Sequence, residues 1–468
     1  MSLSRFIGSG CAIAWSLASA VFAADPNVRV IHASPDAPAV DIRINGAVAI
    51  PDLAFNEFAG YVSLPVGSYQ VEVVPAGASK PVVIDATLNL AADTSYSVYA
   101  VNTLSAIEPL VVIDDRSPVA NGARIRFVHA SPDAPAVDIA VAGGPVLFSD
   151  VTFKEVEAGI TVPAGTYDLE VRLAGTSTVV LPLNDITLGE GFAYTAVATG
   201  LAFGSPALGA LLLTDVTPPA NVRIIHASPD APSVDILVNG GLAIENLAFT
   251  EATDYVSLAA DTYQVQVVPN GMMAPVVIDA TLALEAGVDY TVLAIDELAS
   301  IEPLVLVDDR SLPGNSFRAR FVHASPNAPA VDIAIANGPV LFPNVSFGGT
   351  GAAITAPAGS YDLEVRLAGT STVVLPLPGV RFQVNTVYTV AAVGFVGGNP
   401  GLGAQVYIDA SGPSPAGPAD IDLDGLVGQR DLALLLGAWG TNDAASDIDG
   451  DGTVGGGDIA ILIADWTR

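Results

Sequence analysis

The sequence predicts a mainly β protein, with four tandem β-sandwiches of the immunoglobulin-like or transthyretin-like kind and a small α-helical domain at the C-terminus. Three observations lead to this expectation. One histidine-containing phrase recurs at a constant interval, the segments between its copies read as short strands, and the pattern changes abruptly after residue 411.

The first 23 residues are typical of a secretory signal peptide. Arg5 precedes a run of apolar and small residues that ends at Val21-Phe22-Ala23, a suitable cleavage site. A membrane anchor is the alternative, but the run is short and rich in Gly, Ser and Ala. Cys11 lacks the leucine-like residue three positions earlier that a lipid-attachment cysteine needs. We therefore expect a secreted protein, extracellular or associated with the cell surface, with no transmembrane segment after cleavage.

The composition excludes several function classes. Lys and Arg number 17 against 49 Asp and Glu, which gives a net charge of −32. Nucleic-acid binding through phosphate neutralisation needs clustered positive charge, which this chain lacks. The chain has one cysteine and four histidines, so thiol chemistry and cysteine-rich zinc sites are nearly excluded. Cleavage of the signal would remove Cys11, so the secreted chain would depend on packed cores or metals for its stability.

The histidines define the repeat. His32, His129, His226 and His323 are each 97 residues apart, and each lies in a phrase close to HASPDAPAVDI. A second pattern has twice this period, because residues 167–183 recur unchanged at 361–377. Repeats 1 and 3 are therefore alike, as are repeats 2 and 4, and the order is A-B-A-B. The predicted domains are a signal peptide (1–23), repeat 1 (24–120), repeat 2 (121–217), repeat 3 (218–314), repeat 4 (315–410), a Pro/Gly/Ser linker (411–419) and a C-terminal module (420–468).

Within a repeat, the sequence pattern predicts short β-strands throughout. In repeat 1 we expect strands at 28–33, 40–44, 61–64, 69–74, 82–90, 96–101 and 110–113, with Gly, Pro, Asn or Asp between them. Tyr69, Val71 and Val73 alternate with polar residues, which predicts a half-buried strand. Each repeat is large enough for its own core, and the junctions are short, so neighbours are expected to form a semi-rigid rod.

The repeated phrase contains His, Ser and Asp, which raises the question of catalysis. A triad needs these side chains to converge beside an oxyanion hole, and no motif for one is present. A His/Asp metal site is a second alternative. We favour a structural role, with a His–Asp hydrogen bond across a hairpin and Ser34 capping the turn, because repeat 4 replaces Asp36 by Asn327. The residues concerned are His32, Asp41, His129, Asp138, His226, Asp235, His323 and Asp332.

A second group of charged residues closes each A repeat. Asp114-Asp115-Arg116 recurs as Asp308-Asp309-Arg310. These residues are expected to lie at a solvated strand end, with an interdomain calcium or salt-bridge site as the alternative.

The C-terminal module carries two acidic loops 27 residues apart. In both loops Asp occupies positions 1, 3, 5 and 12 and Gly occupies position 6, which is the ligand spacing of a calcium loop. Four carboxylates repel one another without a cation, so we expect two Ca²⁺ ions and ordering that depends on them. The predicted ligands, with a backbone carbonyl at position 7, are Asp420, Asp422, Asp424, Leu426 and Asp431, and Asp447, Asp449, Asp451, Thr453 and Asp458.

These motifs resemble two known families. The phrase VRVIHASPDAPAVDI followed by LPVGSYQVEVVPAG resembles DUF4397, a family of bacterial extracellular β-domains without an established activity, over residues 27–410. The two loops, each followed by an apolar stretch, resemble a type I dockerin, which implies calcium-dependent docking to a cohesin. Positions 10 and 11 depart from the family, as Gln429-Arg430 and Gly456-Gly457. Trp439 and Trp466, 27 residues apart, are expected to be core or helix-packing residues rather than partner anchors.

Three functions follow as alternatives. The first is a non-catalytic secreted protein, a spacer or adhesive rod that residues 420–468 attach to a cohesin-like or other protein partner. The second is a carbohydrate-binding component of a polysaccharide-degrading complex, in which Tyr61 or Tyr255 would stack on glycans. The third is a hydrolase that uses His32 and Asp41. We favour the first and expect no enzyme activity.

Overall fold

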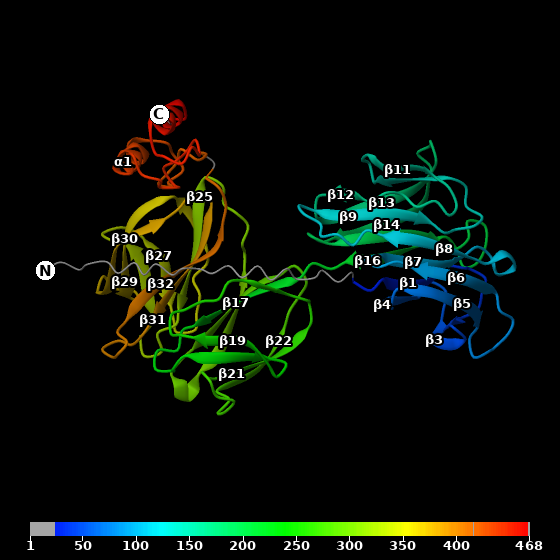
Figure 1. Ribbon diagram of the computed structural model, residues 1–468, viewed down its shortest axis with the longest axis horizontal. Helices are drawn as coiled ribbons and strands as arrows, with labels where there is room; N and C mark the ends of the chain where they lie inside the picture. Colours follow the sequence, from blue (N-terminus) through cyan, green and yellow to red (C-terminus); the bar gives the residue numbers. More distant parts are fainter. Residues whose placement is uncertain (1–23, 415, 467–468) are drawn as a thin grey trace. The chain divides into compact units, whose positions relative to one another are not determined.

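The computed structural model describes residues 24–414 and 416–466, so the predicted signal peptide and Cys11 lie outside the described residues. The chain divides into two compact units, Met1–Thr217 and Pro218–Arg468. Each unit holds two of the four β-repeats, and two short helices follow at the C-terminus (Figure 1). The prediction of a mainly β chain of four sandwich repeats is confirmed. No helix in these ranges is long and apolar enough to cross a membrane.

Each repeat contains eight strands. Repeat 1 comprises β1 (Asn27–His32), β2 (Val40–Ile44), β3 (Ala47–Leu53), β4 (Phe58–Ser63), β5 (Gly67–Pro75), β6 (Ile84–Leu90), β7 (Ser95–Val101) and β8 (Glu108–Asp114). Repeat 2 comprises β9 (Ala123–His129), β10 (Val137–Val141), β11 (Val146–Val151), β12 (Ile160–Val162), β13 (Gly165–Leu173), β14 (Val179–Leu188), β15 (Ala193–Thr199) and β16 (Gly209–Val216).

Unit 2 repeats this plan. Repeat 3 comprises β17 (Ala220–His226), β18 (Val234–Val238), β19 (Gly241–Leu247), β20 (Val256–Leu258), β21 (Thr262–Pro269), β22 (Ile278–Ala283), β23 (Asp289–Ile295) and β24 (Glu302–Asp308). Repeat 4 comprises β25 (Ser316–His323), β26 (Val331–Ile335), β27 (Val340–Val345), β28 (Ile354–Pro357), β29 (Gly359–Leu367), β30 (Val373–Phe382), β31 (Thr386–Val393) and β32 (Gly403–Ser411).

The strands of a repeat form two four-stranded sheets. In repeat 1 one sheet has the order β4-β1-β7-β8 and the other β3-β2-β5-β6, and the other repeats have the same orders in their own strands. The first and seventh strands pair in parallel, and the remaining neighbours are antiparallel. We call the sheet that contains the first strand the inner sheet and its partner the outer sheet.

Inner and outer sheets differ in how their strands are buried. Strand β5 of an outer sheet alternates along much of its length, as expected for a sheet with one solvent-facing side. Strand β7 of an inner sheet is buried or half-buried at every position. Its sequence, SYSVYAV, has no exposed face, because this sheet is covered on both sides.

The inner sheets of repeats 1 and 2 pack against each other. Their facing side chains form one buried cluster that includes Ile31 and Tyr99 from repeat 1 and Val128, Val197 and Leu213 from repeat 2. Separate cores lie between the two sheets of each repeat, so unit 1 is a stack of four sheets. Each repeat thus has its own core, as expected, and the two neighbours also share a core, which was not predicted from the sequence.

Unit 2 has the same shared core. Ile225, Leu293 and Ile295 of repeat 3 contact Val322 and Ala391 of repeat 4. The separate cores of repeats 3 and 4 lie between their own inner and outer sheets.

The C-terminal module contains two short helices, α1 (Gln429–Gly437) and α2 (Gly456–Ala464). They pack around a small core that includes Val427, Leu435, Val454 and Leu462. We call the acidic loops at residues 420–431 and 447–458 loop one and loop two. Loop one is hydrogen-bonded to repeat 4, because the Val384 N–H donates to the Leu423 carbonyl over 2.8 Å.

Candidate functional site

The histidine of each repeat lies at the end of the first strand, in a buried site. The Nε2 of His32 contacts the Pro38 carbonyl at 3.0 Å, and Phe55 packs edge-on against the imidazole ring. The three other copies make the same two contacts, with Pro135 and Phe153, Pro232 and Phe249, and Pro329 and Phe347. Burial lowers the pKa of all four imidazoles, so the neutral ring is favoured.

The aspartate of the phrase bonds backbone amides instead of the histidine. Asp41 accepts hydrogen bonds from the N–H groups of Asp52 and Gly77, both over 2.9 Å. Asp138, Asp235 and Asp332 each accept the two equivalent bonds in their own repeats. The expected His–Asp hydrogen bond is therefore wrong, because each aspartate joins the third strand of its repeat to the turn after the fifth strand. The His and Asp of one phrase have separate partners, which supports the structural interpretation.

One other position of the phrase, that of Asp36, also holds a loop. Asp36 accepts a 2.6 Å hydrogen bond from the Leu104 N–H, and Asp133 and Asp230 hold the equivalent loops. Asn327 accepts from the Val396 N–H and also donates to its carbonyl, so the amide replaces the carboxylate without loss of the contact. Ser34 does not cap the turn as expected, because its buried Oγ has no hydrogen-bond partner among the described residues.

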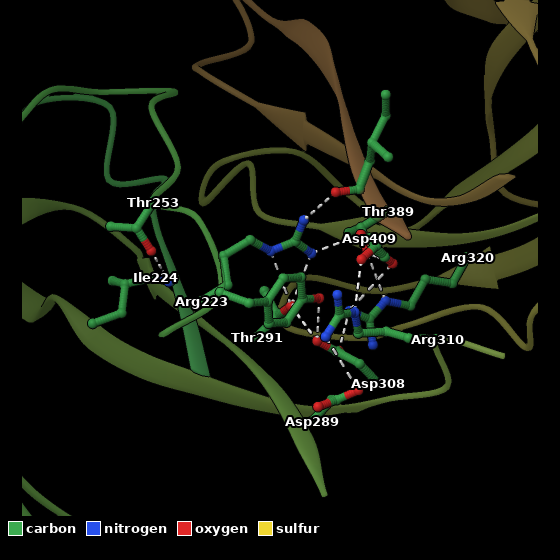
Figure 2. A network of polar contacts seen from close by, with 12 residues as sticks. Arg223, Ile224, Thr253, Asp289, Thr291, Asp308, Arg310, Arg320, Thr389 and Asp409 are labelled. Carbon is green, nitrogen blue, oxygen red and sulfur yellow. Dashed lines mark hydrogen bonds and ion pairs between the residues drawn. The ribbon is translucent and has the colours of Figure 1, made fainter. Parts of the chain in front are cut away.

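The sequence reasoning missed a buried ionic network between paired inner sheets. Arg223 of repeat 3 lies 2.7 Å from Asp409 of repeat 4, and Arg320 of repeat 4 lies 2.5 Å from Asp308 of repeat 3 (Figure 2). Thr291 and Thr389 donate to the remaining oxygens of these two carboxylates. Burial raises the pKa of Asp409, and the Arg223 guanidinium opposes that shift. In unit 1 the same pairs are Arg29 with Asp215 and Arg126 with Asp114.

This network bears on two predictions from the sequence. The Asp114 and Asp308 groups lie in interdomain salt bridges rather than at solvated strand ends. Tyr61 lies beneath the guanidinium groups of Arg29 and Arg116, at 4.7 and 4.3 Å, and its hydroxyl donates to Asp114. Tyr255 has the equivalent contacts. Both rings are thus engaged within the fold. One signal for the network is an arginine three residues before each histidine of the phrase.

Loop one of the C-terminal module brings three predicted ligands together. Carboxylate oxygens of Asp420, Asp422 and Asp431 lie within 4.8 Å of one another, and all three residues are buried. Asp431, in the first turn of α1, accepts bonds from the Asp422 and Gly428 N–H groups. Asp424 is outside this triplet and accepts from the Leu426 N–H.

Charge around loop one is partly balanced within the protein. The Oδ2 atom of Asp422 lies 3.1 Å from Arg381 of repeat 4 and 3.0 Å from Arg430 of α1. Burial raises the pKa of Asp420 and of Asp422, and repulsion from Asp424 and Asp431 raises the pKa of Asp422 further.

Loop two assembles a different triplet, Asp447, Asp449 and Asp451, whose oxygens also lie within 4.8 Å of one another. The Oδ1 atom of Asp447 is buried and has no hydrogen-bond partner among the described residues. Asp458 lies outside the triplet and accepts from three backbone N–H groups, which lower its pKa. The Leu426 N–H donates to Asp424 and the Thr453 N–H donates to Asp451.

The tryptophans of the module differ from each other. Trp466 is half-buried against the module core, as expected, whereas Trp439 is 51 % exposed and is not part of that core. Leu434 and Leu436 of α1 are also exposed. The helix therefore carries more apolar side chains than the small core of the module can cover.

The repeats match one protein family. Its model, described as a domain of unknown function (DUF4397), matches residues 26–140, 123–221, 220–334 and 318–423. The chain belongs to the DUF4397 family. No curated protein matches it. A solved structure, the Bacillus anthracis TIE protein, is similar at 12 % identity over 76 % of this chain and 67 % of that chain, with a TM-score of 0.16.

Proposed function

We propose that this DUF4397 protein is a secreted, non-catalytic modular protein. Its β-repeats serve as a spacer or binding surface, and residues 420–468 bind two Ca²⁺ ions and attach the chain to a protein partner of an extracellular or cell-surface assembly. The observation that carries the proposal is the convergence of carboxylates in two equivalent loops, since oxygen-rich clusters of this spacing suit Ca²⁺.

The residues fit the ion. Asp447 Oδ1 is a buried acceptor without a hydrogen-bond donor, which a cation would satisfy. Asp420, Asp422 and Asp431 would hold the ion of loop one, and Asp447, Asp449 and Asp451 that of loop two. A bound Ca²⁺ would neutralise the repulsion within each cluster and hold each loop against its helix.

The partner-binding half rests on the exposed apolar residues of α1 and on the resemblance to dockerins. Leu434, Leu436 and Trp439 are 42 %, 52 % and 51 % exposed in a module of about fifty residues. Exposed apolar groups of this kind suit a protein interface. The non-catalytic part rests on the histidines and aspartates of the repeats, whose polar contacts serve the turns of the fold.

Calcium titration of the full secreted chain by calorimetry tests the metal sites. We expect two ions per chain, and one ion after the double change Asp447→Asn and Asp449→Asn. Asp465→Asn is the matched control, because Asp465 is an exposed carboxylate of the same module outside both loops. An unchanged stoichiometry in the double variant would refute the assignment.

Affinity capture from envelope and secreted fractions, with Ca²⁺ or with a chelator, tests the attachment. We expect a protein that is retained only with Ca²⁺ and lost with Trp439→Ala, while that variant still binds two ions. Calcium binding without any retained protein would overturn the docking role and leave the metal sites intact.

A further inference from the structure

The two sides of the interface between repeats 3 and 4 are built from equivalent strands, and at one position of these strands the side chains differ greatly in size. Val256 of β20 pairs with Val222, and Ile354 of β28 pairs with Ala319 at the equivalent place in repeat 4. The residue before each is Tyr255 in repeat 3 and Ala353 in repeat 4. A phenol ring on one side of the interface thus corresponds to a methyl group on the other.

On the first side of the interface, formed by repeat 3, the Tyr255 side chain lies among charged groups. The guanidinium carbons of Arg223 and Arg310 lie 4.8 and 4.0 Å from the centre of its ring. Its hydroxyl donates to Asp308 Oδ2 over 2.6 Å, and Thr291 donates to the same oxygen. The ring therefore has cation–π contacts and one charge-assisted hydrogen bond.

The second side has equivalents of Arg223, Asp308 and Thr291 around an open space, with Ser411 in the place of Arg310. A cavity of about 340 Å³ is lined by Ala353 and by Arg318, Arg320, Asp409, Val305 and Val307, among others. Arg320 and Asp409 are the equivalents of Arg223 and Asp308, and Thr389 donates to Asp409 Oδ2 as Thr291 does to Asp308. Figure 2 shows Arg320, Thr389 and Asp409 at this interface. The volume lies at the lower end of the range for small-molecule sites.

We propose that this cavity binds a small phenol, whose ring would lie over Arg320 and whose hydroxyl would donate to Asp409 Oδ2. A neutral ligand is favoured over an ion, because two arginines and two aspartates, Asp309 and Asp409, line the cavity. The apolar part of the lining, Val305 and Val307 of β24, would contact the ring. The chain itself supplies the template, since Tyr255 makes these contacts with the equivalent residues.

In repeat 2 an arginine side chain lies beside the equivalent position. Its equivalent of Tyr255 is Gly159, which precedes Ile160, the partner of Ile125. A Cβ atom added at Gly159 would lie 3.1 Å from the Cγ and Cδ atoms of Arg124, so the arginine side chain covers this position. The equivalent of Arg124 in repeat 4 is Arg318, which lines the cavity there, and the site is assigned to repeat 4 because of that open lining.

Calorimetric titration of the full secreted chain with p-cresol tests the site, with toluene as the probe that has the ring but lacks the hydroxyl. We expect one p-cresol per chain, bound at least tenfold more tightly than toluene. Ala353→Tyr, which copies repeat 3, should weaken p-cresol binding at least tenfold. Tyr255→Ala should open the equivalent space in repeat 3 and raise the stoichiometry from one to two.

Folding of each variant is checked by circular dichroism. If Ala353→Tyr does not fold, Ala353→Val takes its place and should weaken binding at least threefold. Three results would overturn the proposal: no p-cresol binding at millimolar concentration, equal affinity for toluene, or unchanged binding in a folded variant at residue 353.

Discussion

Arg29 and Asp215 form an ion pair of 2.5 Å across 186 residues of sequence, and both side chains are almost completely buried. Arg126 and Asp114 form the reciprocal pair, so each repeat of unit 1 contributes one arginine and one aspartate to the contact. Hydrogen bonds from Ser97 and Thr195 satisfy further oxygens of the two carboxylates. Satisfied groups of this kind favour one register of the two sheets over others.

Removal of one partner of this pair should be costly. We expect Asp215→Ala to lower the free energy of unfolding of unit 1 by about 3–5 kcal/mol, because Arg29 would remain buried without its carboxylate. Lys154→Ala is the matched control, since Lys154 and Glu108 form a half-exposed pair between the same two repeats and should contribute about 0–1 kcal/mol. Denaturant unfolding measures both. Equal effects of the two substitutions would contradict the role assigned to the buried pair.

A single repeat should not form a stable monomer. Residues 24–120 alone would expose the face of the inner sheet that carries Ile31, Tyr99 and Val101, all buried in the pair. We expect this fragment to self-associate or to remain unfolded, whereas residues 24–217 should be monomeric and folded. Circular dichroism and light scattering distinguish these results. A folded, monomeric fragment 24–120 would show that the shared core is dispensable.

Filling the core of repeat 3 should stabilise it. A cavity of about 120 Å³ lies between its two sheets, where Ala280 faces Val265. The equivalent pair in repeat 4 is Leu377 and Leu363, and both leucines pack in that core. We expect Ala280→Leu to raise the free energy of unfolding by about 0.5–2 kcal/mol. Thermal unfolding measures the change, with the exposed site Ala283→Leu as control. A lower midpoint for Ala280→Leu would mean that the added side chain does not fit.

The histidines should make stability depend on pH. Burial lowers their pKa below the ordinary value of 6.5, so below that pH the unfolded chain binds more protons than the folded chain. Their contribution is fully present above pH 6.5 and is lost as the pH falls toward the folded pKa. The melting temperature should therefore fall more between pH 7.5 and 5.5 in the natural chain than after all four are changed to Gln. Parallel curves for the two proteins would refute this.

The sequence predicted the repeats and the strands well, because a 97-residue period and Pro-rich turns are local signals. It also predicted the convergence of acidic residues in both loops, although Asp424 and Asp458 lie outside the triplets. The pairing of inner sheets was missed, since it depends on contacts far apart in the sequence. The sequence did contain one local sign of this pairing. Strands such as β7 lack the alternation of polar and apolar residues, which indicates burial on both faces.

The role of the repeated phrase was only partly predictable. A structural role for its histidine and aspartate follows from the Asp-to-Asn exchange at Asn327, but their partners do not. His32 bonds Pro38 within the phrase, whereas Asp41 bonds Gly77, and neither choice is fixed by residue type. The contacts of the Tyr61 ring could not be predicted either, because nothing in the sequence of an edge strand indicates that Arg29 and Arg116 lie over this ring.

The reciprocal packing of inner sheets has a consequence for how such a chain can change its length. A gene that gained or lost one 97-residue copy would encode a repeat without its counterpart, with an apolar face open to water. Duplication of a whole pair leaves no such face, and the identical segments 167–183 and 361–377 are separated by the length of one pair. Recombination in this lineage should therefore preserve an even number of copies.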